Sequence, residues 1–444
     1  MIVEVKESGL VRPASDTPRR ILSTSNVDLV VARVHTLSIY FYRPSGASDF
    51  IFDAALLKDA LARALVPFYP IAGRLKRRER GRVEIVCNAE GVLFLVAETD
   101  SVVDDLGDFT PTVEFKQLFP KVPSVDDDYS DVPLLLIQVT HFKCGGVSLG
   151  VGVHHVVADG SAAFHFINYW SDVTRGVLDP PEVPRPFIDR TILQPRDPPS
   201  PAFPHVEYHP SPSLKKIMSK STEKEATAAA TLRITPHQLD LLKSKAKDGE
   251  SGTGKPYSTF VSLAAHVWRC ACMARGLADD QETKLHTPAD ARGRLRPPLP
   301  PGYFGCGIFI TAANAVAGEL TSKPAAYAAR KIREAVARVD DDEYLRSALD
   351  YLELQPDLSP HSPLVRGAHT FGCPNLGIVS WARLPIHDAD FGWGRPIFMG
   401  PGNVLYEGYS ILLSSPTNDG SLYLAISLKA HHMERFKKLF YDCL

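Results

Sequence analysis

Two adjacent histidines followed by an aspartate are the residues of this sequence best suited to proton transfer. His154 and His155 end an apolar run, and Asp159 follows four residues after His155. Imidazole titrates near neutral pH, so His155 can take a proton from a hydroxyl or amine nucleophile and return it later. Asp159 can orient that imidazole, as in a catalytic triad, or turn away and pair with an arginine. The spacing leaves both roles open, together with a simpler interpretation as core histidines in a turn.

Two predicted elements hold His155 in place. Residues 147–153 are rich in β-forming side chains and predict a buried strand. From Gly160 onward, apolar residues at helical spacing predict an amphipathic helix. His155 therefore lies where a strand gives way to a helix, a position from which its side chain can face a cleft.

A second predicted strand, residues 34–42, carries polar side chains at alternate positions. Its period of two places Thr36, Ser38 and Tyr40 on one face. Such a face is either exposed to solvent or part of the wall of a cleft, and the pattern favours neither.

Length, charge and cysteine content restrict the class of protein. With 444 residues, 44% of them hydrophobic, the chain is expected to form about two globular domains. A formal net charge of -2 gives no reason to expect nucleic acid or an anionic membrane as a partner. The seven cysteines are scattered without a C-x-x-C pair, which is typical of reduced thiols and argues against zinc. The start of the sequence lacks the apolar core of a signal peptide, and no segment is apolar enough for a membrane helix, so a cytoplasmic protein is expected.

A segment rich in proline divides the chain. Prolines recur from Pro180 to Pro212 and exclude helix and central strand, so we expect a long crossover between two domains. The predicted units are residues 1–179, 180–224 and 225–444. Both halves mix strands and helices, which favours an α/β fold with α+β layers in each. Lys215 and Lys216 follow the last of these prolines and either lie on a solvated surface or meet a phosphate-bearing ligand.

A second unusual string lies near the C-terminus. Asp390, Gly392 and Trp393 belong to the sequence DADFGWGRP, in which two glycines flank a tryptophan. This composition predicts a loop packed by its own aromatic side chains, with a structural role favoured over a chemical one.

The strings HHVVADG and DFGWG together resemble the paired signatures of the plant BAHD acyl-CoA-dependent acyltransferases. The resemblance covers nearly the whole chain and includes TPRR, HTLSIYFYRP, FYPIAGRL, QVTHFKCGGVSLG, PPLPPGYFG and RLPIHDADFGWGRPIFMGP. Within that family these segments are most similar to the shikimate/quinate hydroxycinnamoyltransferase branch.

The resemblance implies a fold and a reaction. It implies a monomer of two chloramphenicol-acetyltransferase-like domains, with a tunnel that admits an acyl-CoA thioester from one side and the acceptor from the other. The expected reaction, in the phenylpropanoid and lignin pathway, moves a p-coumaroyl or caffeoyl group from coenzyme A to a hydroxyl of shikimate or quinate. Acyl-CoA is then a co-substrate, and no permanently bound cofactor or metal is expected.

The resemblance also assigns roles to residues. It makes His155 the general base and Asp159 a structural carboxylate directed toward Arg292, with Asp390, Gly392 and Trp393 in a loop remote from the base. The acceptor carboxylate is expected at Arg366, whose planar fork can form two parallel hydrogen bonds. The other residues expected around the acceptor and acyl group are Thr36, Ser38, Tyr40, Tyr257, Val379 and Trp381. Those expected to contact coenzyme A are Lys215, Lys216, Ser258 and Thr259.

Three positions depart from the branch. Val379 stands where a threonine usually precedes Ser-Trp, Cys306 stands where Tyr-Phe-Gly is usually followed by Asn, and Gly372 replaces a common basic residue. The lost hydroxyl at Val379 leaves a polar acceptor group without its partner, an effect of about 1 to 3 kcal/mol. A different acceptor, an amine or a phenolic, is therefore an alternative to shikimate or quinate.

Two other classes of protein fit part of the sequence. HHVVADG also matches the condensation domains of peptide assembly, although DFGWG and the absence of carrier domains disfavour that interpretation. A non-catalytic relative that binds a phenolic or an acyl-CoA is the other alternative, and the presence of both His155 and Asp159 argues against it.

Overall fold

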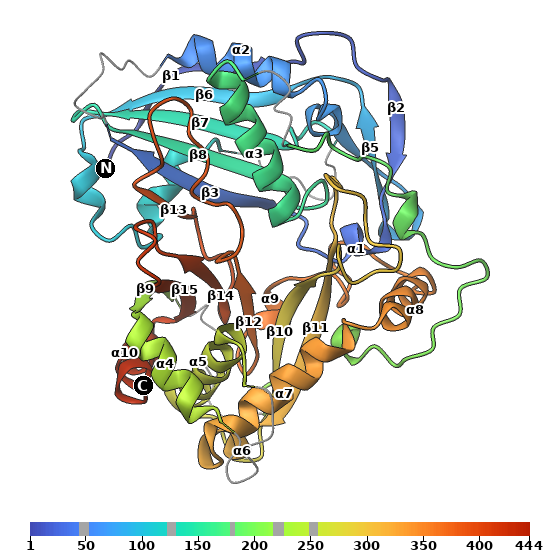
Figure 1. Ribbon diagram of the computed structural model, residues 1–444, viewed down its shortest axis with the longest axis vertical. Helices are drawn as coiled ribbons and strands as arrows, with labels where there is room; N and C mark the ends of the chain where they lie inside the picture. The colour runs from blue at the N-terminus through green and yellow to red at the C-terminus, as the bar shows by residue number, and fades with distance from the viewer. Residues whose placement is uncertain (44–52, 122–129, 178–182, 216–225, 248–255) are drawn as a thin grey trace.

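A computed structural model describes residues 1–43, 53–121, 130–177, 183–215, 226–247 and 256–444. Two six-stranded sheets of mixed direction form the frame, one above the other in Figure 1. The first sheet has the order β1 (Glu4–Val11), β6 (Val92–Thr99), β7 (Leu135–Phe142), β8 (Val147–His154), β3 (His35–Tyr42) and β13 (Phe398–Pro401). The second has the order β11 (Ile308–Val316), β10 (Glu282–Asp290), β12 (Leu376–Ser380), β14 (Tyr409–Ser414), β15 (Leu422–Lys429) and β9 (Thr227–Ile234). A small sheet contains β2 (Arg20–Ser23), β5 (Val83–Cys87) and β4 (Arg74–Arg77).

Helices cover the two large sheets. In Figure 1, α2 and α3 lie over the upper sheet, and α4, α5, α7 and α10 lie at the lower end of the molecule beside the second sheet. The helices before the crossover are α1 (Asn26–Leu29), α2 (Ala54–Ala64) and α3 (Gly160–Thr174). Those after it are α4 (Pro236–Lys245), α5 (Thr259–Arg275), α6 (Ala317–Ser322), α7 (Ala325–Arg338), α8 (Asp342–Glu353), α9 (Ala368–Phe371) and α10 (Ala430–Asp442).

The predicted strand and helix around His155 are confirmed. Every residue of β8 is buried, and β7 and β3 pair with its two edges. Helix α3 begins at Gly160, with Asp159 as its N-cap. Its Trp170 is fully buried and donates from Nε1 to the main-chain oxygen of Leu57 in α2 at 3.1 Å, which ties the two helices together.

One strand crosses from the second half of the chain to the first sheet. In β13, Phe398 pairs with Phe41 and Pro401 with Ser38, so residues near the C-terminus complete the sheet that carries His155. The predicted division into residues 1–179, 180–224 and 225–444 stays a prediction, since its boundaries lie outside the described residues.

The residues from Ile71 to Leu75 also favour the opening of a strand, and this expectation is wrong at its start. Ile71 and Ala72 belong to a short 3-10 helix, η1 (Tyr69–Ala72), rather than to the start of a strand. Pro70 at the beginning of that turn favours helical backbone angles, which explains the difference.

Candidate active site

A cavity of about 890 Å³ lies between the two large sheets. Strand alternation explains how the second sheet contributes to it. Ile378 of β12 faces an apolar core shared with α5 and α10, whereas Gly377 and Val379 on either side of it line the cavity. The predicted site residues that line the cavity are Thr36, Ser38, His155, Asp159, Ser258, Arg366, Val379 and Trp381.

His155 is fixed by its main chain and presents one ring nitrogen to the cavity. Its backbone N–H donates to the main-chain oxygen of Val34 at 3.0 Å. Its Nδ1 lies 3.8 Å from the Sγ of Cys306, and that thiol donates to the main-chain oxygen of His155 at 3.2 Å. The other nitrogen, Nε2, has no hydrogen-bond partner among the described residues. Nε2 is therefore free to bind a substrate hydroxyl.

The surroundings of His155 favour its neutral form. Burial lowers the pKa of His155 below its ordinary value of 6.5, while the charges of Asp159 and Asp28 oppose that change. A neutral imidazole can accept a proton, which is the state that a general base requires. Its neighbour His154 is buried in the core against the ring of His35, at 5.2 Å between ring centroids.

Asp159 pairs with Arg292 rather than with His155. The guanidinium donates to both carboxylate oxygens, at 2.8 and 2.9 Å, and the side chain of Asp159 is fully buried. Backbone N–H groups of Ala162 and Gly307 also donate to the carboxylate, at 3.0 and 2.9 Å. Burial works against the charged form, but Arg292 and these donors lower the pKa of Asp159 below its ordinary value. Of the two roles that the sequence left open, this geometry supports the structural one.

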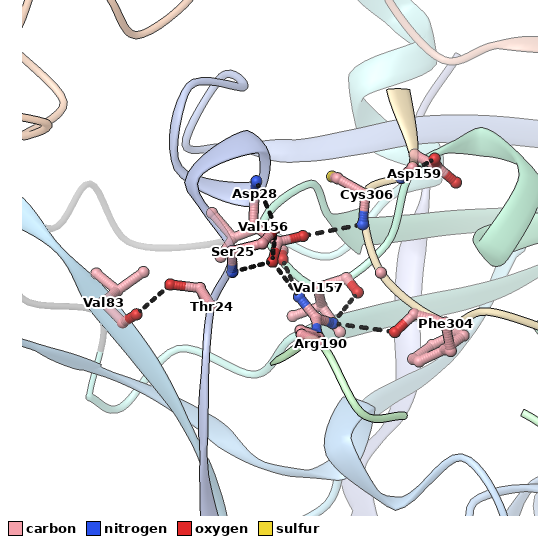
Figure 2. Close-up of polar contacts among 12 residues, drawn as sticks. Thr24, Ser25, Asp28, Val83, Val156, Val157, Asp159, Arg190, Phe304 and Cys306 are labelled. Carbon is pink, nitrogen blue, oxygen red and sulfur yellow. Dashed lines mark hydrogen bonds and ion pairs between the residues drawn. The ribbon is translucent and has the colours of Figure 1, made fainter. Parts of the chain in front are cut away.

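Two further residues beside His155 were missed by the sequence analysis. Asp28 and Arg190 form a buried ion pair at 3.1 Å (Figure 2). Arg190 also donates to the main-chain oxygens of Val156 and Val157, directly after the candidate base. The only sequence signal was the Ser-x-x-Asp pattern at Ser25 and Asp28, which marks a helix start and forms a capping box here.

Arg366 supplies a buried positive charge at the cavity wall. Its guanidinium donates to the main-chain oxygen of Glu207 at 3.1 Å and lies 5.6 Å from the centre of the Tyr208 ring. Burial lowers the pKa of Arg366. The carboxylate of Glu207 is occupied by His205, at 3.0 Å, and by Tyr344, at 2.7 Å. Within the described part of the chain, Arg366 therefore has no carboxylate in ion-pair contact.

Two residues expected at the acceptor lie outside the cavity, and these expectations need correction. Tyr40 is fully buried in the core of the first sheet. It lies on the same face of β3 as Ser38, but there it belongs to an apolar core that includes Leu57, Phe391 and Trp393. Tyr257 is also buried outside the cavity, and the guanidinium of Arg333 lies 4.2 Å from the centre of its ring.

The predicted loop at Asp390 is structural in its contacts. The Asp390 carboxylate accepts hydrogen bonds from the N–H groups of Gly392 and Gly394, at 2.8 and 2.9 Å. Trp393 stacks on Phe391 and meets the Tyr42 ring edge-on, each at 5.5 Å between centroids. None of Asp390, Gly392 and Trp393 lines the cavity. The loop packs the second half of the chain against β3.

The residues expected to contact coenzyme A are not brought together. Lys215 pairs with Asp280 on the surface and lies outside the cavity, which gives no support to its role as a donor contact. Lys216 lies outside the described residues. Ser258 caps α5 by accepting from the N–H of Val261 at 3.2 Å and lines the cavity, whereas Thr259 does not. An arginine that the sequence analysis did not consider, Arg383, is exposed at the cavity instead.

The fold and the site together are those of an acyltransferase. A neutral histidine opens onto a cavity between two mixed sheets, and that cavity is large enough for a small-molecule substrate. The chain belongs to the transferase family, the BAHD acyltransferases, whose family model matches residues 1–443.

Similar proteins agree with this membership. A shikimate O-hydroxycinnamoyltransferase of Nicotiana tabacum is 60% identical over 450 residues, and the match covers 100% of both chains. A hydroxycinnamoyl-CoA:5-hydroxyanthranilate N-hydroxycinnamoyltransferase of Avena sativa is 54% identical over 456 residues, again with 100% of both chains covered. The crystal structure of vinorine synthase shares the fold, with a TM-score of 0.73 and 22% identity over 98% of this chain and 96% of that one. The condensation-domain alternative is therefore set aside.

No helix among the described residues has the length and apolar character needed to cross a membrane.

Proposed function

We propose that this enzyme transfers a hydroxycinnamoyl group from its coenzyme A thioester to a hydroxyl of shikimate or quinate. The observation that carries the proposal is one cavity lined by both His155, with Nε2 free, and Arg366, a buried cation with no carboxylate partner in the described chain. A shikimate acyltransferase 60% identical to this chain supports it.

The proposed reaction needs one base. Nε2 of His155 takes the proton of the acceptor hydroxyl as its oxygen attacks the thioester carbonyl. A C–O bond forms, and the C–S bond then breaks as the tetrahedral intermediate collapses. The imidazolium returns the proton to the departing sulfur, giving an ester and free coenzyme A. The pair with Arg292 keeps Asp159 charged but directed away, so His155 works without a carboxylate partner on its ring.

Arg366 is the proposed contact of the acceptor carboxylate. A buried guanidinium without a counter-ion is costly, and an anionic acceptor supplies that counter-ion on binding. Thr36, Ser38, Val379 and Trp381 form nearby walls of the same cavity. The thioester end of the donor must reach His155, and we place the phosphate groups toward Arg383 and the capping residue Ser258.

An amine acceptor is the second candidate. The relative from Avena sativa is named as an N-hydroxycinnamoyltransferase, and Val379 lacks the hydroxyl usual in the shikimate/quinate branch. Incubation of the enzyme with p-coumaroyl-CoA and shikimate, quinate, 5-hydroxyanthranilate or an uncharged phenolic decides between these acceptors. Product masses identify the acceptor, and ester formation with shikimate or quinate at the highest kcat/KM is the expected result. An amide as the main product would replace this proposal with the second one.

Three finer features belong to the same proposal. We expect a monomeric enzyme in the cytoplasm of a plant cell, acting in phenylpropanoid and lignin synthesis. The named relatives from Nicotiana tabacum and Avena sativa support the plant source. The seven scattered cysteines are the reason for expecting a reducing compartment.

A further inference from the structure

We propose that the buried pair of Asp28 and Arg190 positions the candidate base, His155. Three segments that are distant in sequence meet at this pair: α1, the crossover, and the segment that leads into β11 (Figure 2). The inference rests on the proposed function, because it concerns the base of that reaction.

Arg190 fixes the chain that follows the base. Its guanidinium donates to the main-chain oxygens of Val156 at 3.0 Å and Val157 at 2.6 Å, and a longer bond of 3.4 Å reaches Phe304. Arg190 comes from the crossover, yet its side chain is only 2% exposed. These bonds hold the turn between β8 and α3, which determines where the imidazole of His155 points.

Asp28 fixes the other side of the base. Its Oδ1 accepts from the backbone N–H of Cys306 at 2.9 Å, while its Oδ2 accepts from the N–H and hydroxyl of Ser25 at 2.7 and 2.8 Å. The thiol of Cys306 in turn contacts Nδ1 and the main-chain oxygen of His155. Asp28 therefore reaches the imidazole through a single intervening residue.

The two buried ion pairs act on consecutive residues. Asp28 accepts from the amide of Cys306, and Asp159 accepts from the amide of Gly307. Two carboxylates from the first half of the chain thus bind neighbouring amides from the second half, directly beside the base. A segment held at both amides has little freedom to shift, so the sulfur stays against the Nδ1 side of His155.

Stability alone does not account for this arrangement. Neither Asp28 nor Arg190 lines the cavity, so neither can touch a substrate. A buried ion pair is often no more stabilising than well-packed apolar side chains of similar volume. Its bonds do fix main-chain positions, and an error of about 1 Å in a reacting group can lower a rate about 100-fold. We therefore assign Asp28 and Arg190 as positioning residues.

The test compares them with a matched carboxylate away from the base. Asp350 in α8 is also fully buried, and it accepts from Nε of Arg196 at 2.6 Å and from the N–H of Ser200 at 3.0 Å. Asp28→Asn and Asp350→Asn both remove a buried charge that holds the crossover. We expect Asp28→Asn to lower kcat about 10- to 100-fold with the KM of both substrates within about twofold of wild type. Asp350→Asn should lower the Tm but leave kcat nearly unchanged.

A conservative variant and a pH profile complete the test. Arg190→Lys keeps the charge and one carbonyl bond, so it should show a smaller loss of kcat and remains informative if Asp28→Asn does not fold. The groups that face His155 are Asp159 on α3, Cys306 before β11, His154 on β8 and the Asp28–Arg190 pair. Since the negative charge of Asp28 favours the imidazolium, Asp28→Asn should move the acid limb of the kcat profile to lower pH.

Two results overturn the inference. In the first, Asp28→Asn and Arg190→Lys have the same kcat as Asp350→Asn. In the second, Asp28→Asn and Arg190→Lys lower only the Tm and leave the pH profile of kcat unchanged. His155→Ala, measured beside them, separates this failure from failure of the proposed function. If His155→Ala is inactive while the Asp28 and Asp350 variants behave alike, only the positioning role of Asp28 and Arg190 is refuted. If His155→Ala turns over normally, the assigned base itself is wrong.

Discussion

Arg292 donates two hydrogen bonds, of 2.8 and 2.9 Å, to the carboxylate of Asp159, and this pairing directs the carboxylate away from His155. Gly307 leaves room for the guanidinium, since a Cβ there would lie 2.8 Å from Nη1 of Arg292 and would force it to shift. The Asp of the His-x-x-x-Asp string therefore holds the cap of α3 and the approach to β11. The imidazole of His155 therefore has the thiol of Cys306, and no carboxylate of the described chain, beside its Nδ1.

The first prediction follows from this pairing. Asp159→Asn keeps an oxygen for the helix cap but leaves the charge of Arg292 without its partner. Removing one partner of a buried ion pair costs about 3 to 5 kcal/mol of folding stability. We expect a lower Tm by circular dichroism together with a loss of activity. An unchanged Tm with a large fall in kcat would instead favour a triad role for Asp159.

The second prediction concerns the base. His155→Ala should lower kcat by a factor on the order of 10² to 10⁴, because the proposed reaction moves the acceptor proton through Nε2 of this imidazole. His154→Gln changes the neighbouring core histidine and serves as the matched control for damage to the fold. Near-normal turnover of a folded His155→Ala protein would contradict the assignment.

The third prediction is the direction of the pH dependence. His155 acts as a base only when neutral, so the rate rises with pH as the imidazole loses its proton. Burial lowers the pKa of His155, so the acid limb of kcat/KM should have its midpoint below 6.5. The kcat/KM for the acceptor is measured at saturating acyl-CoA from about pH 4.5 to about 8. A midpoint above 6.5 in the enzyme that already holds acyl-CoA would show that the charges of Asp28 and Asp159 outweigh burial.

The immediate surroundings of His155 could be predicted from sequence, because they depend on local signals. The apolar run of β8 and the helical spacing after Gly160 determine both elements over a few residues. Asp28 and Arg190 could not be found this way. Their contact joins positions 162 residues apart in the sequence and leaves no periodic pattern. The resemblance to acyltransferases did lead to Arg292, although its contact with Asp159 spans 133 residues.

Tyr40 shows a different limit. A period of two places Tyr40 on the face of Ser38, and that inference about direction is sound. Ser38 lines the cavity, whereas Tyr40, two residues further along the same face, belongs to an apolar core with Leu57, Phe391 and Trp393. Alternation indicates which way a side chain points but not what lies opposite. The same limit applies to Lys215, whose charge pairs with Asp280 rather than facing the cavity.

The fourth prediction distinguishes two sources of positive charge for coenzyme A. Arg383 is exposed at the cavity and has no ion-pair partner among the described residues, whereas Lys215 is paired with Asp280 on the surface. Arg383→Ala should raise the KM for acyl-CoA and leave the KM for the acceptor nearly unchanged. Lys215→Ala is the matched control and should change neither. Because exposed charges are screened by salt, the effect of Arg383→Ala should shrink as ionic strength rises. If only Lys215→Ala raised the KM for acyl-CoA, Lys215 rather than Arg383 would be the contact of coenzyme A.

The last prediction concerns the acceptor and combines Arg366 with Val379. Both line the cavity, and Nε of Arg366 is enclosed without a hydrogen-bond partner in the described chain. If shikimate binds through its carboxylate, Arg366→Ala should cost about 1.5 to 3 kcal/mol of binding, the value of hydrogen bonds to a charged group. Arg366→Lys should recover only part, because an ammonium lacks the planar fork of the guanidinium.

Val379→Thr adds a hydroxyl on the same wall and should raise kcat/KM for shikimate, since a polar acceptor group then gains a partner. An uncharged phenolic acceptor is the control: Arg366→Ala should spare it, and Val379→Thr should not improve it. The measurement is kcat/KM for shikimate, quinate and the phenolic across wild type, Arg366→Ala, Arg366→Lys and Val379→Thr. Equal use of shikimate by Arg366→Ala and wild type would refute the carboxylate contact. If Val379→Thr raised kcat/KM only for the phenolic, residue 379 would contact an acceptor other than shikimate or quinate.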